Sequence, residues 1–347
     1  MGGTDLAGRP GPMGGSGLLG RTGPVGRELG AGWRALPRRL AISALLLVLL
    51  SFAVFVGVDL LPGDPVTARL GATSGPERIA QVRAHLGLDR PVQARYGDWL
   101  AGLVRGDLGT SATGRPVGEL LADRVGNSVL LAGLAWVLLV PCSLLLGVLA
   151  AWRRGRVVDR AISTGALLLV SVPEFAVTGG LVVLFAVTLR WLPAVSLVPA
   201  GTNPLLRPEM LVLPVLGLLL AGLAYATRVI RGAAVSAVDS PQVEFLRLSG
   251  VRGSVVLRRA VVPAVLPVAV QVWLITAVAS VGGAVLVENI VGYPGIGQLL
   301  VSSVQTGDLP VVQALVLLLG AAMLLALVLA DLAVVLLTPR LRTGAVR

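Results

Sequence analysis

The sequence predicts an all-α integral membrane protein with six transmembrane helices. Three observations lead to this prediction: 55% of the 347 residues are hydrophobic, only 14% are charged, and the apolar residues lie in long runs with few charges. Soluble domains contain about 25% charged residues, whereas a helix needs roughly 20 apolar residues to cross a bilayer core of about 30 Å. Runs of this length cannot all be cores of a soluble fold.

Six runs are long enough to span the membrane, and each contains at most one charge. They cover residues 40–61, 128–151, 161–189, 210–227, 260–287 and 309–338. A charge at the centre of a membrane helix costs about 2.5–3.5 kcal/mol on insertion scales. Glu174 lies roughly in the middle of the third run and is therefore the most informative of these acids. Asp59 and Glu288 are expected near the outer interface, where the cost is small, and Asp331 is expected to anchor packing at the cytoplasmic end.

The positions of the arginines predict that both termini are cytoplasmic. All 29 basic residues are arginine, and 19 of them lie before the first run, after the last run, or in the second and fourth connections. The third and fifth connections hold two arginines, and the remaining eight share the long first connection with seven acids. Cytoplasmic loops carry an excess of positive charge. The formal net charge of +11 is thus an orientation signal, and no nucleic-acid partner is expected.

The rarity of reactive side chains argues against an enzyme. The chain has no lysine, one histidine (His85) and one cysteine (Cys142). Without lysine there is no phosphate-binding P-loop and no Schiff base. A single histidine and a single cysteine exclude a His/Cys metal cluster, an internal disulfide and a Cys-x-x-Cys redox pair. We expect no catalytic residue, no metal site and no cofactor bound by this chain.

The segments outside the runs complete the predicted organisation. The domains are a disordered cytoplasmic tail at 1–37, the first transmembrane helix at 38–61, an extracytoplasmic helical element at 62–127, a core of five transmembrane helices at 128–338 and a second cytoplasmic tail at 339–347. The tail at 1–37 is rich in Gly and Pro, which disfavours folding. In the extracytoplasmic element, Pro76 opens a first helix, a second covers 92–104 with Tyr96, Trp99 and Leu100 facing inward, and residues 106–109 form a tight turn.

The connection at 232–259 is too polar to span the bilayer, yet its pattern is helical. Asp-Ser-Pro at 239–241 is a helix start signal, and Glu244 is placed to favour the helix dipole. Gly250 ends this short helix, and a basic piece then leads into the fifth run. A short amphipathic helix on the cytoplasmic face suits docking to another protein. The alternative is a helix that rests on lipid headgroups.

At this connection the sequence resembles a known family. Glu-Phe-Leu-Arg-Leu-Ser-Gly at 244–250, followed by Leu-Pro at 266–267, is similar to the EAA loop of ABC-importer permeases. Further motifs resemble the dipeptide/oligopeptide permease subfamily, in order and at family spacing: Leu-Pro-Gly-Asp-Pro at 61–65, Leu-Gly-Leu-Asp-Arg-Pro at 86–91, Gly-Asp-Leu-Gly-Thr-Ser at 106–111, Gly-Ala-Val-Leu-Val-Glu at 283–288, Tyr-Pro-Gly-Ile-Gly at 293–297 and Asp-Leu-Pro-Val-Val-Gln at 308–313. The resemblance covers residues 38–342.

The resemblance implies a type I ABC importer permease fold in the cell membrane. Such a subunit pairs with a homologous permease, two cytoplasmic ATPases that bind ATP, an extracytoplasmic solute-binding protein and membrane lipid, and it carries peptides or a similar small solute. The missing lysine agrees with ATP hydrolysis on a partner chain. Carried over from the family, the ATPase-coupling residues are Asp239, Glu244, Arg247, Ser249, Gly250 and Val251. The extracytoplasmic motif residues are Glu288, Pro294, Gly295 and Gly297.

The sequence departs from the family pattern at several points. Leu246 and Leu248 replace the alanines of the EAA loop, and Glu174 follows Pro173 where relatives usually carry a small polar residue. Prolines within spans free backbone carbonyls, which is tolerable only beside protein or a cavity. We hypothesise that Pro173 and Glu174 face the translocation path, where a peptide amino terminus would be the natural counter-charge, or that Glu174 faces a partner helix. A Glu174 that hydrogen-bonds within its own bundle is the alternative.

A secondary, ion-coupled transporter is the alternative function. In that case Glu174 and Asp331 would be the proton sites. Such transporters are commonly built from internal repeats, and we find no self-similarity between the two halves of this sequence. The ion-coupled alternative also gives the polar connection at 232–259 no role. The sequence therefore favours the importer permease.

Overall fold

The computed structural model describes residues 25–59, 90–197 and 204–337, together with residues 75 and 77. Within these ranges the secondary structure is helical, apart from one isolated bridge between Thr110 and Pro116. Five of the described helices are long and apolar enough to cross a membrane, and a bent pair raises the number to six. The predicted all-α membrane fold is confirmed. The helix expected to open at Pro76, and His85, lie outside the described residues.

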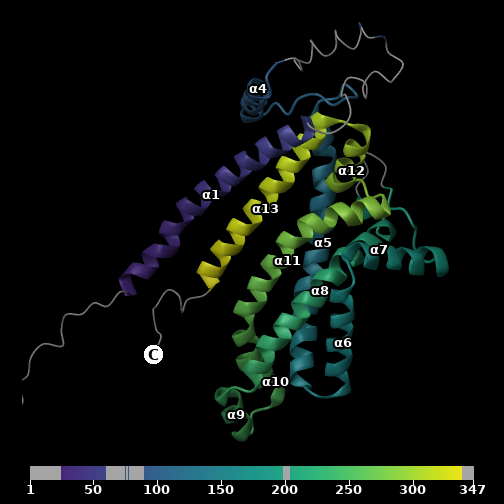
Figure 1. Ribbon diagram of the computed structural model, residues 1–347. Coiled ribbons are helices and arrows are strands. Elements are labelled where there is room, and N and C mark those ends of the chain that lie inside the picture. Colours follow the sequence, from purple (N-terminus) through teal and green to yellow (C-terminus); the bar gives the residue numbers. More distant parts are fainter. Residues whose placement is uncertain (1–24, 60–74, 76, 78–89, 198–203, 338–347) are drawn as a thin grey trace, which may run out of the picture.

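The elements form a bundle with short helices at both ends. The long helices are α1 (Val25–Asp59), α5 (Val117–Trp152), α8 (Glu209–Val238), α11 (Val262–Val291) and α13 (Leu309–Leu337). The shorter elements are α4 (Val92–Val104), α6 (Val157–Ser171), α7 (Glu174–Val182), α9 (Pro241–Leu248), α10 (Gly253–Val256), α12 (Ile296–Thr306), a 3-10 turn η2 (Pro204–Leu206) and two π-helical segments, η1 (Val183–Thr188) and η3 (Leu257–Val261). Figure 1 shows α4 and α12 towards one end of the bundle, the α4 end, and α9 and α10 at the other, the α9 end.

The centre of the bundle is made by α5, α8 and α11. Helix α8 packs along α5 and against α11, while α13 packs against α11 and α1. In Figure 1, α1 and α13 lean away from the other helices towards the α9 end. Two glycines permit the close approaches at the centre. A Cβ at Gly147 of α5 would lie 2.6 Å from the Ile230 side chain, and one at Gly222 of α8 would lie 2.6 Å from Thr276. Small residues at such crossings let membrane helices pack closely.

Several helix ends differ from the predicted bounds. Helix α1 begins at Val25, within the segment that we expected to be disordered. Helix α5 begins directly after Pro116 rather than at residue 128, because its first turns pack Val117 and Leu121 against α13. Helix α4 has the predicted bounds, and the tight turn after it is confirmed by left-handed backbone at Gly106 and Gly109.

The third predicted span is not one continuous helix. Helices α6 and α7 are bent by 104° at a break between them. The physical reason is Pro173, which cannot donate a backbone hydrogen bond and pushes Val172 into the extended conformation (φ −100°, ψ 130°). Glu174 is therefore the first residue of α7, not the middle of a straight helix as we had expected.

The polar connection at 232–259 is almost entirely helical. Helix α8 continues past the apolar run to Val238, α9 follows after a short turn, and α10, η3 and α11 form a nearly continuous helix from Gly253 to Val291. Helix α12, between the last two spans, was not predicted. Its residues are of mixed polarity, and it packs against α11, α13 and α5.

Candidate coupling element and translocation path

Helix α9 begins and ends where the sequence predicts. Ser240 is its N-cap residue and accepts a hydrogen bond from the Val243 N–H at 3.4 Å, and Pro241 takes the first helical position. Ser and Pro are favoured at these two positions because they satisfy or remove amide groups that have no partner within the helix. Two residues after the helix, Gly250 has a φ of +73°, so the chain reverses direction there. The predicted start and end signals are confirmed.

The two faces of α9 differ in burial. Val243 is 1% exposed and packs into the cluster shared by α8, η3 and α11, and Leu246 is partly buried against the same cluster. On the other face, Phe245 is 69% exposed and Leu248 is 81% exposed. We call Phe245 and Leu248 the apolar ridge. Leu246 and Leu248 replace the family's alanines. Leu246 thus anchors α9 to the bundle, and Leu248 enlarges the exposed apolar surface of α9.

The end of α5 and the turn after it hold α9 in place. The Arg154 guanidinium pairs with the Asp239 carboxylate at 2.8 Å, and the Arg247 guanidinium lies over the Trp152 ring, 4.7 Å from its centroid. Trp152 also lies beside Gly253, at the start of α10. Exposed contacts of this kind contribute only about 0–1 kcal/mol each. Their effect is to fix the position of α9 relative to α5.

A second ion pair joins α6 to α8 near the same end of the bundle. Arg231 donates two hydrogen bonds to the buried Asp159 carboxylate, from Nε to Oδ1 at 2.6 Å and from Nη2 to Oδ2 at 2.9 Å. The Gly155 N–H and the Ser163 hydroxyl also donate to Asp159. Sequence reasoning missed this pair, because its members lie 72 positions apart and Arg231 was counted only as an orientation signal.

At the α4 end the family motif residues form one packed unit around Glu288. This side chain is completely buried, and its carboxylate accepts hydrogen bonds from the Ser128 hydroxyl at 2.6 Å and the Gly297 N–H at 2.7 Å. The Ser128 oxygen in turn accepts the Ile296 N–H at 2.9 Å. We call these four residues the Glu288 hub.

Glu288 lies in the last turn of α11, but its complete burial contradicts the expected small cost of its charge. The carboxylate can be buried because it receives amide donors from the N-terminus of α12, which have no partner within that helix. A Cβ at Gly295 or at Gly297 would lie too close to the carboxylate. The Asn127 amide donates to the Pro294 carbonyl at 2.9 Å, which completes the contact of the predicted motif with α5.

Two further polar contacts join helices and loops at the α4 end. Burial raises the pKa of Tyr293 above its ordinary value, and its hydroxyl donates to the Asn127 carbonyl at 3.1 Å. The Ser111 hydroxyl donates to the buried Asp308 carboxylate directly before α13. Polar contacts therefore join α5 to the residues before α12, and the segment before α5 to the start of α13.

Glu174 lies beside a pocket halfway along the bundle. The pocket has a volume of about 320 Å³, and α8 and α11 supply the rest of its wall, including Tyr225, Ile275, Thr276 and Ser280. The Glu174 carboxylate lies against Gly283 of α11, in the space that a Cβ there would occupy. Pro173, directly before it, is exposed. Of the two residues predicted to face the path, Glu174 thus lies at a pocket between three helices, whereas Pro173 is not among the residues that line it.

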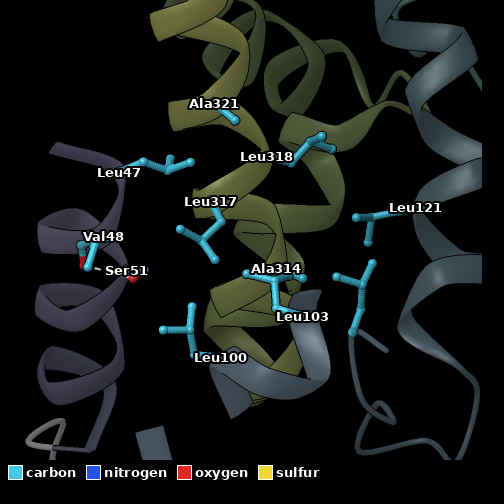
Figure 2. A pocket seen from close by; sticks show the side chains of 11 residues that line it. Leu47, Val48, Ser51, Leu100, Leu103, Leu121, Ala314, Leu317, Leu318 and Ala321 are labelled. Atoms are coloured by element: carbon cyan, nitrogen blue, oxygen red, sulfur yellow. Dashed lines mark hydrogen bonds between the residues drawn. The ribbon is translucent and has the colours of Figure 1, made fainter. Parts of the chain in front are cut away.

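A second pocket, shown in Figure 2, is apolar. It has a volume of about 260 Å³ and lies between α1, α4, α5 and α13, with Leu47, Leu103, Leu121 and Leu317 in its wall. Its one polar side chain, Ser51, already donates to the Val48 carbonyl at 2.8 Å. The wall of this pocket therefore carries no charged side chain, in contrast to the wall of the Glu174 pocket. Within the described ranges, no cluster of three or more His, Cys, Asp or Glu side chains could hold a metal ion.

Together these features define a multi-pass helical membrane protein with a capped helix at one end of the bundle and a buried polar hub at the other. Residues 143–343 match the model of the family described as "binding-protein-dependent transport system inner membrane component", and residues 33–122 match the N-terminal model of the same system. The chain belongs to this family of ABC transporter permeases.

Individual relatives agree with this assignment over nearly their whole length. A protein of Brucella abortus (strain 2308), provisionally named a peptide transport system permease, is 34% identical over 311 residues, which are 88% of this chain and 98% of the relative. The metal-staphylopine import system permease protein CntB of Staphylococcus aureus (strain NCTC 8325 / PS 47) is 32% identical over 313 residues, 89% of this chain and 98% of the relative. The named solutes of these two relatives differ.

The family assignment establishes several points. The chain is a multi-pass membrane permease subunit of an ABC importer and is not itself an enzyme. Membership implies, in general, a partner permease, ATPase subunits and a binding protein. The comparisons give no support to the ion-coupled alternative.

Proposed function

We propose that this chain forms, with a homologous permease, the translocation path for a peptide or a similar small solute. An extracytoplasmic binding protein delivers the solute, and two cytoplasmic ATPases bind and hydrolyse the ATP. The observation that supports this proposal most directly is the apolar ridge on α9, presented at one end of the bundle by a helix with a defined start and end. Apolar side chains that gather on an exposed surface commonly mark sites of protein interaction.

The connectivity of α9 suits the transmission of movement. Helix α9 follows α8 after a short turn and leads through Gly250 into α10 and α11. Both α8 and α11 line the Glu174 pocket. A displacement of α9 by a docked ATPase is therefore passed to two of the walls of that pocket. The coupling roles of Asp239, Glu244, Arg247, Ser249, Gly250 and Val251 are part of this proposal.

Removing the apolar ridge is expected to weaken the ATPase contact. In the double variant Phe245→Ala/Leu248→Ala, co-purification of the ATPase subunits should fall at least tenfold, because each truncated anchor costs about 1–2 kcal/mol or more. The matched control is Val157→Ala, which shortens an exposed apolar side chain at the start of α6. Equal ATPase recovery with the double variant and the control would contradict the docking role.

The proposed orientation places the α9 end in the cytoplasm. Single cysteines at Ser249, after α9, and at Thr306, at the end of α12, are both exposed and lie towards opposite ends of the bundle. With Cys142 replaced by Ala, we expect a membrane-impermeant thiol reagent added to intact cells to label Thr306→Cys. We expect Ser249→Cys to be labelled only after the membrane is opened. The reverse pattern would show that the orientation is inverted.

A further inference from the structure

The Glu174 pocket combines a carboxylate with a position deep within the bundle. Tyr225 lies near the middle of α8, and Thr276 lies near the middle of α11, so the pocket is about halfway between the two ends. Among the residues that the structure describes, no arginine forms an ion pair with Glu174. A carboxylate at this depth is expensive unless a partner offsets it, and such residues commonly mark solute pathways.

Two of the three hydroxyl groups in the wall, those of Thr276 and Ser280, present acceptors rather than donors. The Thr276 hydroxyl donates to the Val272 carbonyl at 2.8 Å, and the Ser280 hydroxyl donates to the Thr276 carbonyl at 2.9 Å. Each hydroxyl hydrogen is thereby used within α11, and each oxygen keeps lone pairs that can accept. A carboxylate and two hydroxyl oxygens around one pocket complement a group that has several donors and a positive charge. A primary ammonium, with three N–H donors and no acceptor, fits this description.

The absence of a side chain at Gly283 makes room for the Glu174 carboxylate within the bundle. An acid in the first turn of a helix is favoured by the helix dipole alone, and Glu174 is in the first turn of α7. The dipole, however, does not require the carboxylate to lie against another helix. Here the carboxylate occupies the space of the missing side chain at Gly283 of α11, whereas the neighbouring Gly282 has nothing within 4 Å of its Cβ position.

We infer that the Glu174 pocket is a binding subsite for a primary ammonium group of the transported solute, such as the amino terminus of a peptide. The inference rests on the proposed function, since it assigns a substrate class to the proposed path. The pocket binds the ammonium through the Glu174 carboxylate and the Thr276 and Ser280 oxygens while the solute passes between α7, α8 and α11.

The first test measures the cation preference of the pocket without transport. In a Cys142→Ala background, Ser280→Cys places a thiol in the wall, and the purified full-length chain is treated with cationic aminoethyl and anionic sulfonatoethyl methanethiosulfonate. Relative to a small free thiol, we expect the cationic reagent to be favoured about tenfold or more, since a cleft of one charge concentrates the opposite ion. Glu174→Gln should remove this preference. The matched control Glu209→Gln, in the exposed first turn of α8, should leave it unchanged.

A second pair of variants separates the charge from its position. Gly283→Ala pushes the flexible carboxylate out of its place while keeping the charge, and Gly282→Ala adds the same methyl group in open space. We expect the cation preference to fall several-fold in Gly283→Ala and to persist in Gly282→Ala. A preference that survives both Glu174→Gln and Gly283→Ala, or that is absent with Glu174 intact, would overturn the inference.

The third test uses the complete transporter with its partner permease, ATPases and binding protein in proteoliposomes. The probes are trialanine and N-acetyltrialanine, which differ in the amino terminus. We expect Glu174→Gln to reduce trialanine uptake about tenfold or more relative to N-acetyltrialanine, compared with Glu209→Gln. An equal effect on both probes would overturn the ammonium assignment. Failure of the wild-type complex to take up either probe with ATP would contradict the proposed peptide path, while the labelling experiment still decides whether the pocket prefers cations.

Discussion

Replacement of Gly250 by valine is expected to abolish stimulation of the partner ATPases by the loaded binding protein, with membrane insertion intact. Gly250 has a φ of +73°, in the left-handed region. This conformation costs an ordinary residue about 1–2 kcal/mol, and a β-branched residue more. The strain is relieved when the turn opens, which shifts α9 relative to α10 and breaks the hydrogen bond from the Val251 N–H to the Leu246 carbonyl. The apolar ridge is then presented at a different angle.

The matched control is Gly250→Asn, because asparagine tolerates the left-handed conformation better than other residues with a side chain. We expect this variant to keep most of the stimulation. Both variants should insert equally well, since residue 250 lies outside the apolar spans. The measurement is ATPase activity of the reconstituted complex with and without loaded binding protein. Wild-type stimulation in Gly250→Val would rule out the turn as part of the coupling element.

Replacement of Glu288 by alanine is expected to cause a large loss of stability. The Ser128 hydroxyl and the Gly297 N–H would both lose their buried acceptor. Each buried donor without a partner costs about 1–3 kcal/mol, so we expect a loss of roughly 2–6 kcal/mol in the free energy of unfolding. The α12 N-terminus would also separate from α5.

The thermal unfolding midpoint in detergent provides the measurement. Glu209→Ala is the control, because Glu209 is an exposed acid in the first turn of α8. We expect the control to unfold at a temperature close to that of the wild type, and Glu288→Ala to unfold many degrees lower or to be recovered in small amounts. An unfolding midpoint of Glu288→Ala equal to that of Glu209→Ala would disprove the stabilising role of the hub.

Local signals predicted local structure well in this chain. The bounds of α4, the cap and end of α9, and the start of α13 follow from prolines, glycines and an N-cap serine that act within a few residues. Five of the six apolar runs correspond to continuous helices long enough to span, and the third corresponds to the bent pair, because the bilayer imposes a minimum helix length. The break at Pro173 could have been anticipated from the same rule that bends helices at proline, although its angle could not.

Tertiary contacts account for what the sequence could not predict. The pairing of Asp159 with Arg231, the burial of Glu288 and the position of Glu174 against Gly283 each depend on which helices pack together. Glu288 was expected at an interface because its distance along α11 suggests one. Its burial follows only from α12, a helix of mixed polarity that no apolar run reveals.

The Glu288 hub holds one end of the near-continuous helix from Gly253 to Val291 and α9 adjoins the other end, so the coupling that we propose requires this helix to tilt about the hub. Its 39 residues span about 58 Å at 1.5 Å per residue. A tilt of about 5° around the hub moves the end beside α9 by about 5 Å and the wall of the Glu174 pocket, less than halfway along, by about 2 Å. A hydrogen bond tolerates a change of only a few tenths of an ångström, so a tilt of this size is enough to break the contacts of the proposed ammonium subsite.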